Sequence, residues 1–340
     1  MVQQNADQAV HEAARAGLVD KLAAMLAENP SLIDAKGMDS RTPLHCAGTV
    51  AAAALLLDRG ARIDARDEDH DSTPAQWRIG ESPDVARFLL DHGAKADIFL
   101  AAALGDVALA ESLVREDRGC LTHRIGKAPE FPPIGYEGLG GTIYQWTLGF
   151  NCYPHQIALL KGQQAMFDYL YAESDTRTRL LVSCVLARRA EAEAIANAHP
   201  EIVPELPDVD RELVAKYCWE TNTNYAAVKL MLDLGFPVAH PERSHGCTPL
   251  HNAAWAGSGD LVELLIERGH PVDIRDPAFD ATPLGYALYD CLVEKRHPEG
   301  EFARVVRALV AAGSPLEGVK YPTGHAAIDE VLHPFWKGGL

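Results

Sequence analysis

The 340-residue sequence has little positive charge and no long apolar run. Lysine and arginine together number 31 against 48 aspartates and glutamates, so the formal net charge is −17. A field of this sign repels phosphate backbones and no basic stripe opposes it, which argues against a nucleic-acid partner. No apolar run approaches the roughly 18 residues of a membrane span, and the first residues lack the pattern of a signal peptide. We therefore expect a cytoplasmic protein with no membrane partner.

Motifs of metal and catalytic sites are also missing. The seven cysteines are scattered and form no CxxC pair, which favours reduced thiols. The stretch "HGCTPLH" places His245, Cys247 and His251 close together, but their spacing matches no closed zinc pattern. There is no GxSxG, no HExxH and no phosphate loop. We predict neither a metal nor a cofactor.

What the sequence does contain is a repeat. "TPLH" begins at Thr42 and again at Thr248, and Thr-Pro recurs at Thr73 and Thr282. Threonine can cap a helix and proline fits its first turn, so each pair predicts a helix start. A second apolar run follows in each unit and ends in a glycine suited to a left-handed helix end. These glycines are Gly60, Gly93, Gly235, Gly269 and Gly313.

These residues resemble the ankyrin repeat, most closely in "TPLHNAAWAGSGDLVELLIERGHPVDIRD" from Thr248. The resemblance implies an all-α fold, an ankyrin-repeat α-solenoid of about nine helix pairs. The order of units is similar to that of bacterial multi-repeat ankyrin proteins to which no activity attaches, so it implies a fold and no reaction. The predicted pairs lie at 7–30, 42–60, 73–93, 98–116, 153–173, 179–204, 210–235, 248–269 and 282–313, with a capping helix at 324–336.

Two insertions interrupt the repeats. The first is rich in Pro and Gly and is long enough to be a lid or a binding loop. Within it, the alternation in "GGTIYQWTLG" places Tyr144 and Trp146 on one side and predicts a β-hairpin-like finger. The second, 291–301, splits the last helix pair. The predicted boundaries within one continuous solenoid are 1–116 for N-terminal repeats, 117–152 for the finger, 153–316 for C-terminal repeats and 317–340 for the cap.

Aromatic and amide residues recur where the first helices should line the concave side of the array. Repeat arrays use this surface for binding. Trp255 is not needed to build the "TPLH" unit, and large aromatics either fill gaps between units or form binding hot spots. The set as a whole favours a groove. Its predicted ligand-binding residues are Gln76, Trp77, Tyr144, Trp146, Trp219, Asn222, Asn252, Trp255, Tyr286 and Tyr289.

The sequence therefore predicts a binding module that holds a protein or peptide segment on an aromatic-lined concave groove. The alternative is an enzyme (a lyase, isomerase or hydrolase) or a sensor, acting on a small-molecule ligand enclosed under the finger. An enzyme needs acid–base groups close to the reacting atoms, and the candidates are His155, Asp290 and Tyr144. By contrast, His45 and His251 occupy the fourth place of the motif, where the imidazole is expected to hydrogen-bond between neighbouring loops.

Overall fold

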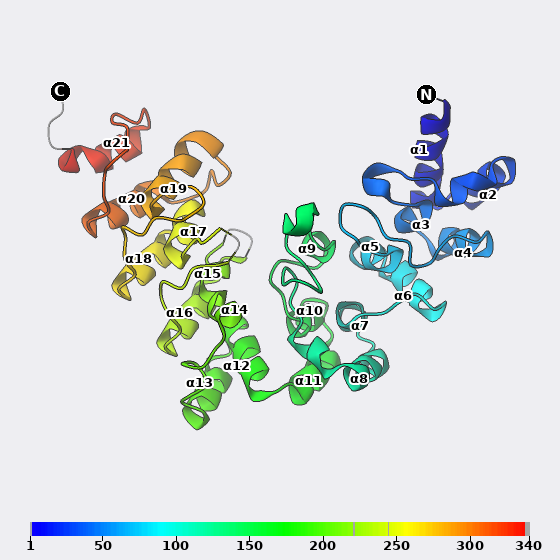
Figure 1. The fold of residues 1–340 in the computed structure, drawn as a ribbon, viewed down its shortest axis with the longest axis horizontal. Coiled ribbons are helices and arrows are strands. Elements are labelled where there is room, and N and C mark those ends of the chain that lie inside the picture. The colour runs from blue at the N-terminus through cyan, green and yellow to red at the C-terminus, as the bar shows by residue number, and fades with distance from the viewer. Residues whose placement is uncertain (1, 220–221, 244, 337–340) are drawn as a thin grey trace. The chain divides into compact units, whose positions relative to one another are not determined.

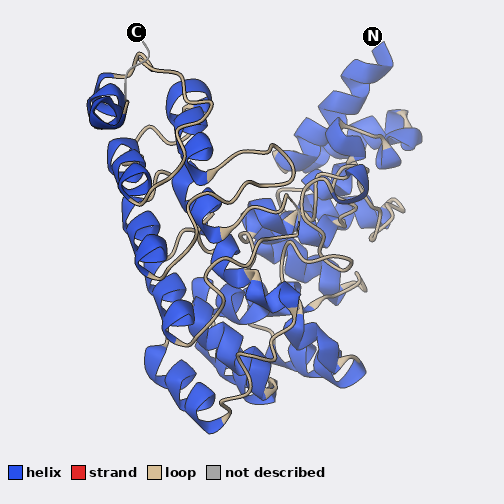
Figure 2. Cartoon of the chain, turned by 60° about the vertical axis from the view of Figure 1, so that its left-hand side comes forward, coloured by secondary structure: helices blue, strands red, loops and turns tan. Residues whose placement is uncertain are grey.

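The structure, a computed structural model, describes residues 2–219, 222–243 and 245–336. Every regular element in these ranges is a helix, and no strand is present among them (Figure 2). The nearest approach to a sheet is a single bridge between Lys127 and Phe131. Among the described residues, no helix is long and apolar enough to cross a bilayer. The all-α prediction is confirmed.

The chain divides into two compact units, Met1–Thr178 and Arg179–Leu340. Helices follow one another in pairs in each unit (Figure 1). Those of the first unit are α1 (Val2–Arg15), α2 (Val19–Glu28), α3 (Pro43–Cys46), α4 (Val50–Asp58), α5 (Pro74–Glu81), α6 (Pro83–Asp91), α7 (Ile98–Leu104), α8 (Val107–Glu116), α9 (Tyr144–Thr147), α10 (Pro154–Leu160) and α11 (Gln164–Glu173).

Helix α12 (Thr176–Val185) begins at the boundary between the units, and the other helices of the second unit continue the same pattern. They are α13 (Arg189–Ala198), α14 (Asp208–Arg211), α15 (Leu213–Lys216), α16 (Tyr225–Asp233), α17 (Pro249–Trp255), α18 (Gly259–Glu267), α19 (Pro283–Tyr289), α20 (Phe302–Ala311) and α21 (Ala326–Leu332). All nine predicted pairs and the capping helix are present. Residues 337–340 of the predicted cap lie outside the described part, and the predicted domain boundaries stay a prediction.

The Thr-Pro turn explains where the first helices start. The Thr42 N–H donates to Nδ1 of His45 at 3.0 Å, and the Thr248 N–H donates to Nδ1 of His251 at 3.2 Å. Because Nδ1 accepts, Nε2 carries the proton and donates to a carbonyl of the next loop: Ser72 O at 3.1 Å for His45 and Ala281 O at 3.1 Å for His251. The structural role predicted for both histidines is confirmed.

Glycine follows the second helix of five helix pairs, as predicted. The five glycines have φ between 82° and 93°, a conformation that other residues adopt only with strain. Between the turn and the glycine, the paired helices bury small and branched residues against each other. In α17 and α18 these are Leu250, Ala253, Ala254, Leu261, Leu264 and Leu265.

The prediction of a β-hairpin finger is wrong, because residues 144–147 form the short helix α9. Its backbone bonds are local: the Thr147 N–H donates to Ile143 O at 3.2 Å and the Leu148 N–H to Tyr144 O at 2.8 Å. Helix α9 packs on α5, where a Cβ on Gly80 would lie 2.8 Å from Thr147 Cβ. Residues two apart in a helix point to opposite sides. Tyr144 is accordingly fully buried, whereas Trp146 is 61% exposed.

Candidate binding site

In the first unit, Gln76 and Tyr144 are anchored on one carboxylate. The Tyr144 hydroxyl donates to Oδ2 of Asp97 at 2.7 Å, and Nε2 of Gln76 donates to the same oxygen at 2.9 Å. The other oxygen of Asp97 accepts the Phe99 N–H at 2.9 Å and so caps α7. Burial raises the pKa of Tyr144 well above its usual value. Both side chains therefore hold this part of the fold together.

The two tryptophans predicted as ligand-binding in this unit have separate surroundings. Trp77 donates from Nε1 to Oδ1 of Asp67 at 3.1 Å, and the Arg41 guanidinium lies 4.5 Å from the centre of its ring. Trp146 is exposed and meets Phe150 edge-on at 5.9 Å between ring centres. Neither tryptophan is among the residues that line the cavity next to Gln76.

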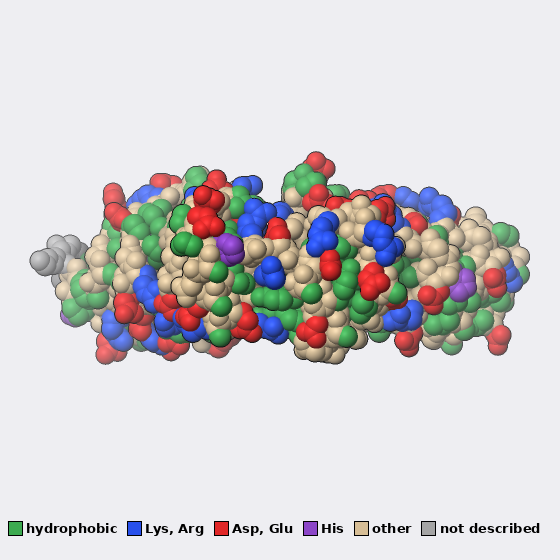
Figure 3. Space-filling view, turned by 90° about the horizontal axis from the view of Figure 1, so that it is seen from below, with side chains coloured by type: hydrophobic (Ala, Val, Ile, Leu, Met, Phe, Trp, Pro, Cys, Tyr) green, Lys and Arg blue, Asp and Glu red, His purple; other side chains and the backbone are tan. Residues whose placement is uncertain are grey.

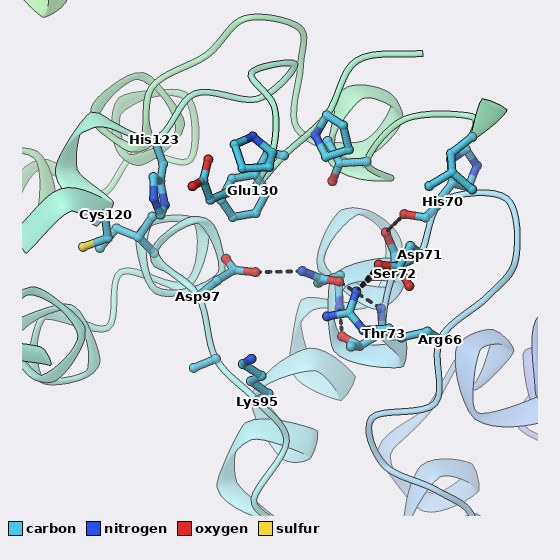
Figure 4. A pocket seen from close by; sticks show the side chains of 18 of the residues that line it. Arg66, His70, Asp71, Ser72, Thr73, Lys95, Asp97, Cys120, His123 and Glu130 are labelled. Atoms are coloured by element: carbon cyan, nitrogen blue, oxygen red, sulfur yellow. Dashed lines mark hydrogen bonds and ion pairs between the residues drawn. The ribbon is translucent and has the colours of Figure 1, made fainter. Parts of the chain in front are cut away.

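A polar cavity of about 710 Å³ lies in the first unit (Figure 4). Asp97, His123 and Glu130 gather at one side of it, and Arg66 and Asp71 lie at the other. Burial lowers the pKa of His123 and raises that of the neighbouring Cys120 to about 11, so this thiol is protonated near neutral pH and a poor nucleophile. No group of three metal-ligating side chains occurs in the ranges that the structure describes.

The second unit brings four predicted residues together. Trp219, Trp255, Tyr286 and Tyr289 line one pocket of about 750 Å³, called here the aromatic pocket. These residues come from three consecutive helix pairs: Trp219 follows α15, Trp255 ends α17, and both tyrosines belong to α19. The remaining lining residues are Glu242, His245, Cys247, Phe279, Ala281, Gly285, Glu294 and Arg296.

The rings of the aromatic pocket are arranged around Trp255. Its indole is parallel to that of Trp219 within 2°, with 6.5 Å between ring centres. Tyr289 stacks on it at 6.2 Å with an angle of 23°, and Tyr286 meets it edge-on at 6.0 Å. Trp255 Nε1 is buried and has no hydrogen-bond partner among the described residues. The pocket thus offers ring faces, which bind apolar and cationic groups.

None of the lining residues from the loops before α17 and α19 or from the second insertion was predicted as ligand-binding, and neither was Gly285 of α19. Glu242 and Cys247 belong to the loop before α17, Phe279 belongs to the loop before α19, and Glu294 and Arg296 belong to the second insertion. A signal for two lining positions existed, because Cys247 and Ala281 directly precede Thr248 and Thr282. Cys247, at this offset, contacts Tyr286 of α19, the first helix of the following unit.

The thiol of the aromatic pocket is unreactive. Cys247 Sγ lies 3.1 Å from the Tyr286 hydroxyl, and burial raises the pKa of Cys247 to about 11. Burial and the neighbouring thiol also raise the pKa of Tyr286. Both groups are therefore neutral near pH 7, and the ionisable character of the pocket comes from its other residues.

The two predicted asparagines do not line the pocket. Asn252 is fully buried, and its Nδ2 donates to Ala215 O at 3.0 Å, which ties α17 to α15. Asn222 donates its backbone N–H to Trp219 O at 2.9 Å. The Asn252 side chain thus joins two first helices of the second unit, and the ligand-binding role of Asn222 stays a prediction.

The residues suggested for an enzyme lie in different units. His155 and Tyr144 belong to the first unit, and Asp290 belongs to the second. His155 is fully buried with Nε2 at 2.9 Å from Ser174 Oγ, and burial lowers its pKa to about 4. Asp290 is also fully buried, and its carboxylate accepts the backbone N–H of Arg296 at 3.1 Å and that of His297 at 3.3 Å. It fastens the second insertion to α19.

Charges of both signs are mixed on the surface. On the face drawn in Figure 3, Lys and Arg side chains are interspersed with Asp and Glu, and neither sign forms a continuous patch. Several of these charges are paired between neighbouring helix pairs, such as Arg304 of α20 with Glu263 of α18, whose closest atoms are 2.6 Å apart. Exposed pairs of this kind contribute little to stability.

Comparison with known proteins adds one family. The ankyrin-repeat family model matches residues 245–277, the unit that begins at Thr248. Among solved structures, the chain is similar to the crystal structure of the human ASB11 ankyrin repeat domain, with 20% sequence identity and a TM-score of 0.33. The comparison covers 90% of this chain and 98% of that chain. No curated protein matches the sequence. The family match covers one unit, residues 245–277, within a succession of helix pairs, several of which begin at Thr-Pro turns and end at left-handed glycines.

Proposed function

We propose that the protein is a binding module for a peptide segment of a protein partner, and that one side chain of this segment enters the aromatic pocket. Ankyrin repeats are generally protein-interaction modules. The observation that carries the proposal is the convergence of four aromatic rings from three consecutive helix pairs on one pocket. Clustered Trp and Tyr residues are the commonest hot spots of protein interfaces.

The rim of the pocket supports a peptide as the occupant. Phe279 is 69% exposed and Tyr289 is 49% exposed, and both rings border the pocket. Exposed apolar area that continues from a pocket onto the surrounding surface is typical of a protein-interaction site. A peptide would fill the pocket with one side chain and cover these rings with its neighbours.

The test is a selection of peptides from a random heptapeptide library against the immobilised full-length protein. Trp255→Ala should weaken binding of the enriched peptides at least about 30-fold, the loss that removal of a hot-spot residue causes. Trp146→Ala removes an exposed tryptophan of the first unit and should leave binding unchanged. Circular dichroism of both variants checks that the helices remain.

Two results would contradict the proposal. In one, no peptide is enriched, or the enriched peptides bind the Trp255→Ala variant as well as the original protein. In the other, native mass spectrometry of the purified protein finds a small molecule bound at near one-to-one amounts, released by Trp255→Ala. The second result would favour the sensor or enzyme alternative.

A further inference from the structure

The aromatic pocket contains a carboxylate without a strong partner. The Glu242 side chain is only 12% exposed, and the nearest cationic group to it among the described residues is the His245 imidazole, with Nδ1 at 3.7 Å from Oε1. No Lys or Arg of the described ranges pairs with it. A carboxylate taken largely out of water costs free energy unless a cation or several hydrogen-bond donors compensate. Glu242 is thus placed to receive a positive charge from outside the chain.

The rings beside Glu242 suit the same charge. Trp219, Trp255 and Tyr289 line the pocket, and an aromatic face attracts a cation through its quadrupole, most strongly for Trp. The stem of a lysine or arginine is apolar and packs well on such rings while its charged end reaches a carboxylate. Rings and a carboxylate in one pocket are therefore complementary to both parts of a basic side chain.

The chain already places one guanidinium at this pocket. Arg296 lies with Cζ 6.0 Å from the centre of the Trp255 ring, and its Nε is 3.3 Å from Oε2 of Glu294. This internal arrangement combines the same three groups: a cation, an indole and a carboxylate. It uses Glu294 and leaves Glu242 with the His245 imidazole and no Lys or Arg partner among the described residues.

We propose that the side chain taken by the aromatic pocket is an arginine or a lysine of a basic peptide segment, with its charged group paired to Glu242. This inference rests on the proposed function and specifies its partner. Two carboxylates against one arginine give the lining an excess of negative charge, and the whole chain has a net charge of −17. Arg296 opposes the incoming cation, so removing its charge should strengthen binding.

The test uses the tightest-binding peptide from the heptapeptide selection, synthesised with its anchor residue unchanged and with a neutral replacement. Citrulline replaces arginine and norleucine replaces lysine, and binding to the full-length protein is measured by calorimetry. Glu242→Gln should raise the dissociation constant of the basic peptide about tenfold and leave that of the neutral peptide unchanged. Arg296→Gln should lower the dissociation constant of the basic peptide about threefold. Glu267→Gln, an exposed position of α18 outside the pocket, is the control for the loss of one negative charge.

The outcomes separate this inference from the proposed function. If Trp255-dependent peptides are anchored by a neutral aromatic or aliphatic residue, and Glu242→Gln does not weaken them, the cationic specificity is overturned while the binding module stands. If no peptide depends on Trp255, both proposals fail. Opposite signs for Glu242→Gln and Arg296→Gln support the inference, because a general loss of folding would weaken binding in both variants.

Discussion

Within the Thr-Pro motif, a residue's offset decides whether it is structural. The fourth residue, His45, Gln76 or His251, is turned back to the threonine N–H and hydrogen-bonds within the fold. The eighth residue of two adjacent units, Trp255 and Tyr289, faces the pocket, and the two rings lie 6.2 Å apart. Neighbouring repeats stack equivalent positions side by side, so an aromatic at one offset in consecutive units creates a shared surface.

The buried histidines make stability depend on pH. Burial lowers the pKa of His45, His155 and His270 to about 4, below the usual 6.5 of an exposed imidazole. The unfolded chain therefore binds more protons below pH 6.5, so their contribution is present above pH 6.5 and is lost as the pH falls towards 4. Each such histidine should lower the free energy of unfolding by about 2 kcal/mol between neutral pH and pH 5.

Urea unfolding at pH 7.5 and pH 5.0 checks this for His155. His155→Gln can still donate to Ser174 but does not titrate, so the variant should lose about 2 kcal/mol less than the original protein between the two pH values. Carboxylates also titrate in this range, but they are common to both proteins and cancel in the difference. An equal loss of unfolding free energy in the original protein and in His155→Gln would show that His155 is not buried in its neutral form.

At the scale of elements, the repeat pattern predicted the helices well and the insertions poorly. Thr-Pro starts mark four of the nine pairs and glycine ends mark five, and the apolar runs between them placed the other pairs. The segment around α9 alternates like a strand, but a strand needs a partner and Gly80 instead lets α9 pack closely on α5. Trp255, Tyr286 and Tyr289 of the first helices were predicted, whereas Glu242 and Phe279 were not, because loop conformation depends on contacts between units.

We predict that the conformation of the second insertion depends on one buried carboxylate, that of Asp290. It leaves α19 through a π-helix, Asp290–Glu294, and returns to place Arg296 at the aromatic pocket. The Asp290 carboxylate holds this path by accepting the backbone N–H groups of Arg296 and His297. Hydrogen bonds to a charged group are worth about 1.5–3 kcal/mol, so Asp290→Asn should raise the amide exchange rate of residues 294–300 at least about tenfold.

Hydrogen exchange followed by mass spectrometry measures this effect. Peptides from α18 serve as the internal control and should exchange at their original rate, since this helix is held by its own buried leucines. Exchange of residues 294–300 at the original rate in Asp290→Asn would mean that other contacts hold the insertion. Faster exchange throughout the second unit would instead assign Asp290 to the stability of the whole unit.

At the scale of the molecule, the repeats supply a scaffold and the departures from the repeat supply the candidate site. The two units each have their own buried residues, and the aromatic pocket lies within the second. Its rings occupy positions that the repeat leaves free, and its charged residues come from a loop and an insertion. Function in such an array is therefore better sought in residues that the motif does not require than in the motif itself.

The net charge of −17 gives the last prediction, which concerns the rate of binding. A negative field attracts a basic peptide before contact and is screened by salt, so it acts mainly on association. Raising NaCl from about 50 to about 500 mM should slow association of an arginine-anchored peptide about tenfold and change its dissociation far less. Surface plasmon resonance measures both rates, and the citrulline peptide is the control for the anchor charge. An association rate that is independent of salt would mean that the acidic surface does not steer the partner, and that any cationic preference is confined to contacts inside the aromatic pocket.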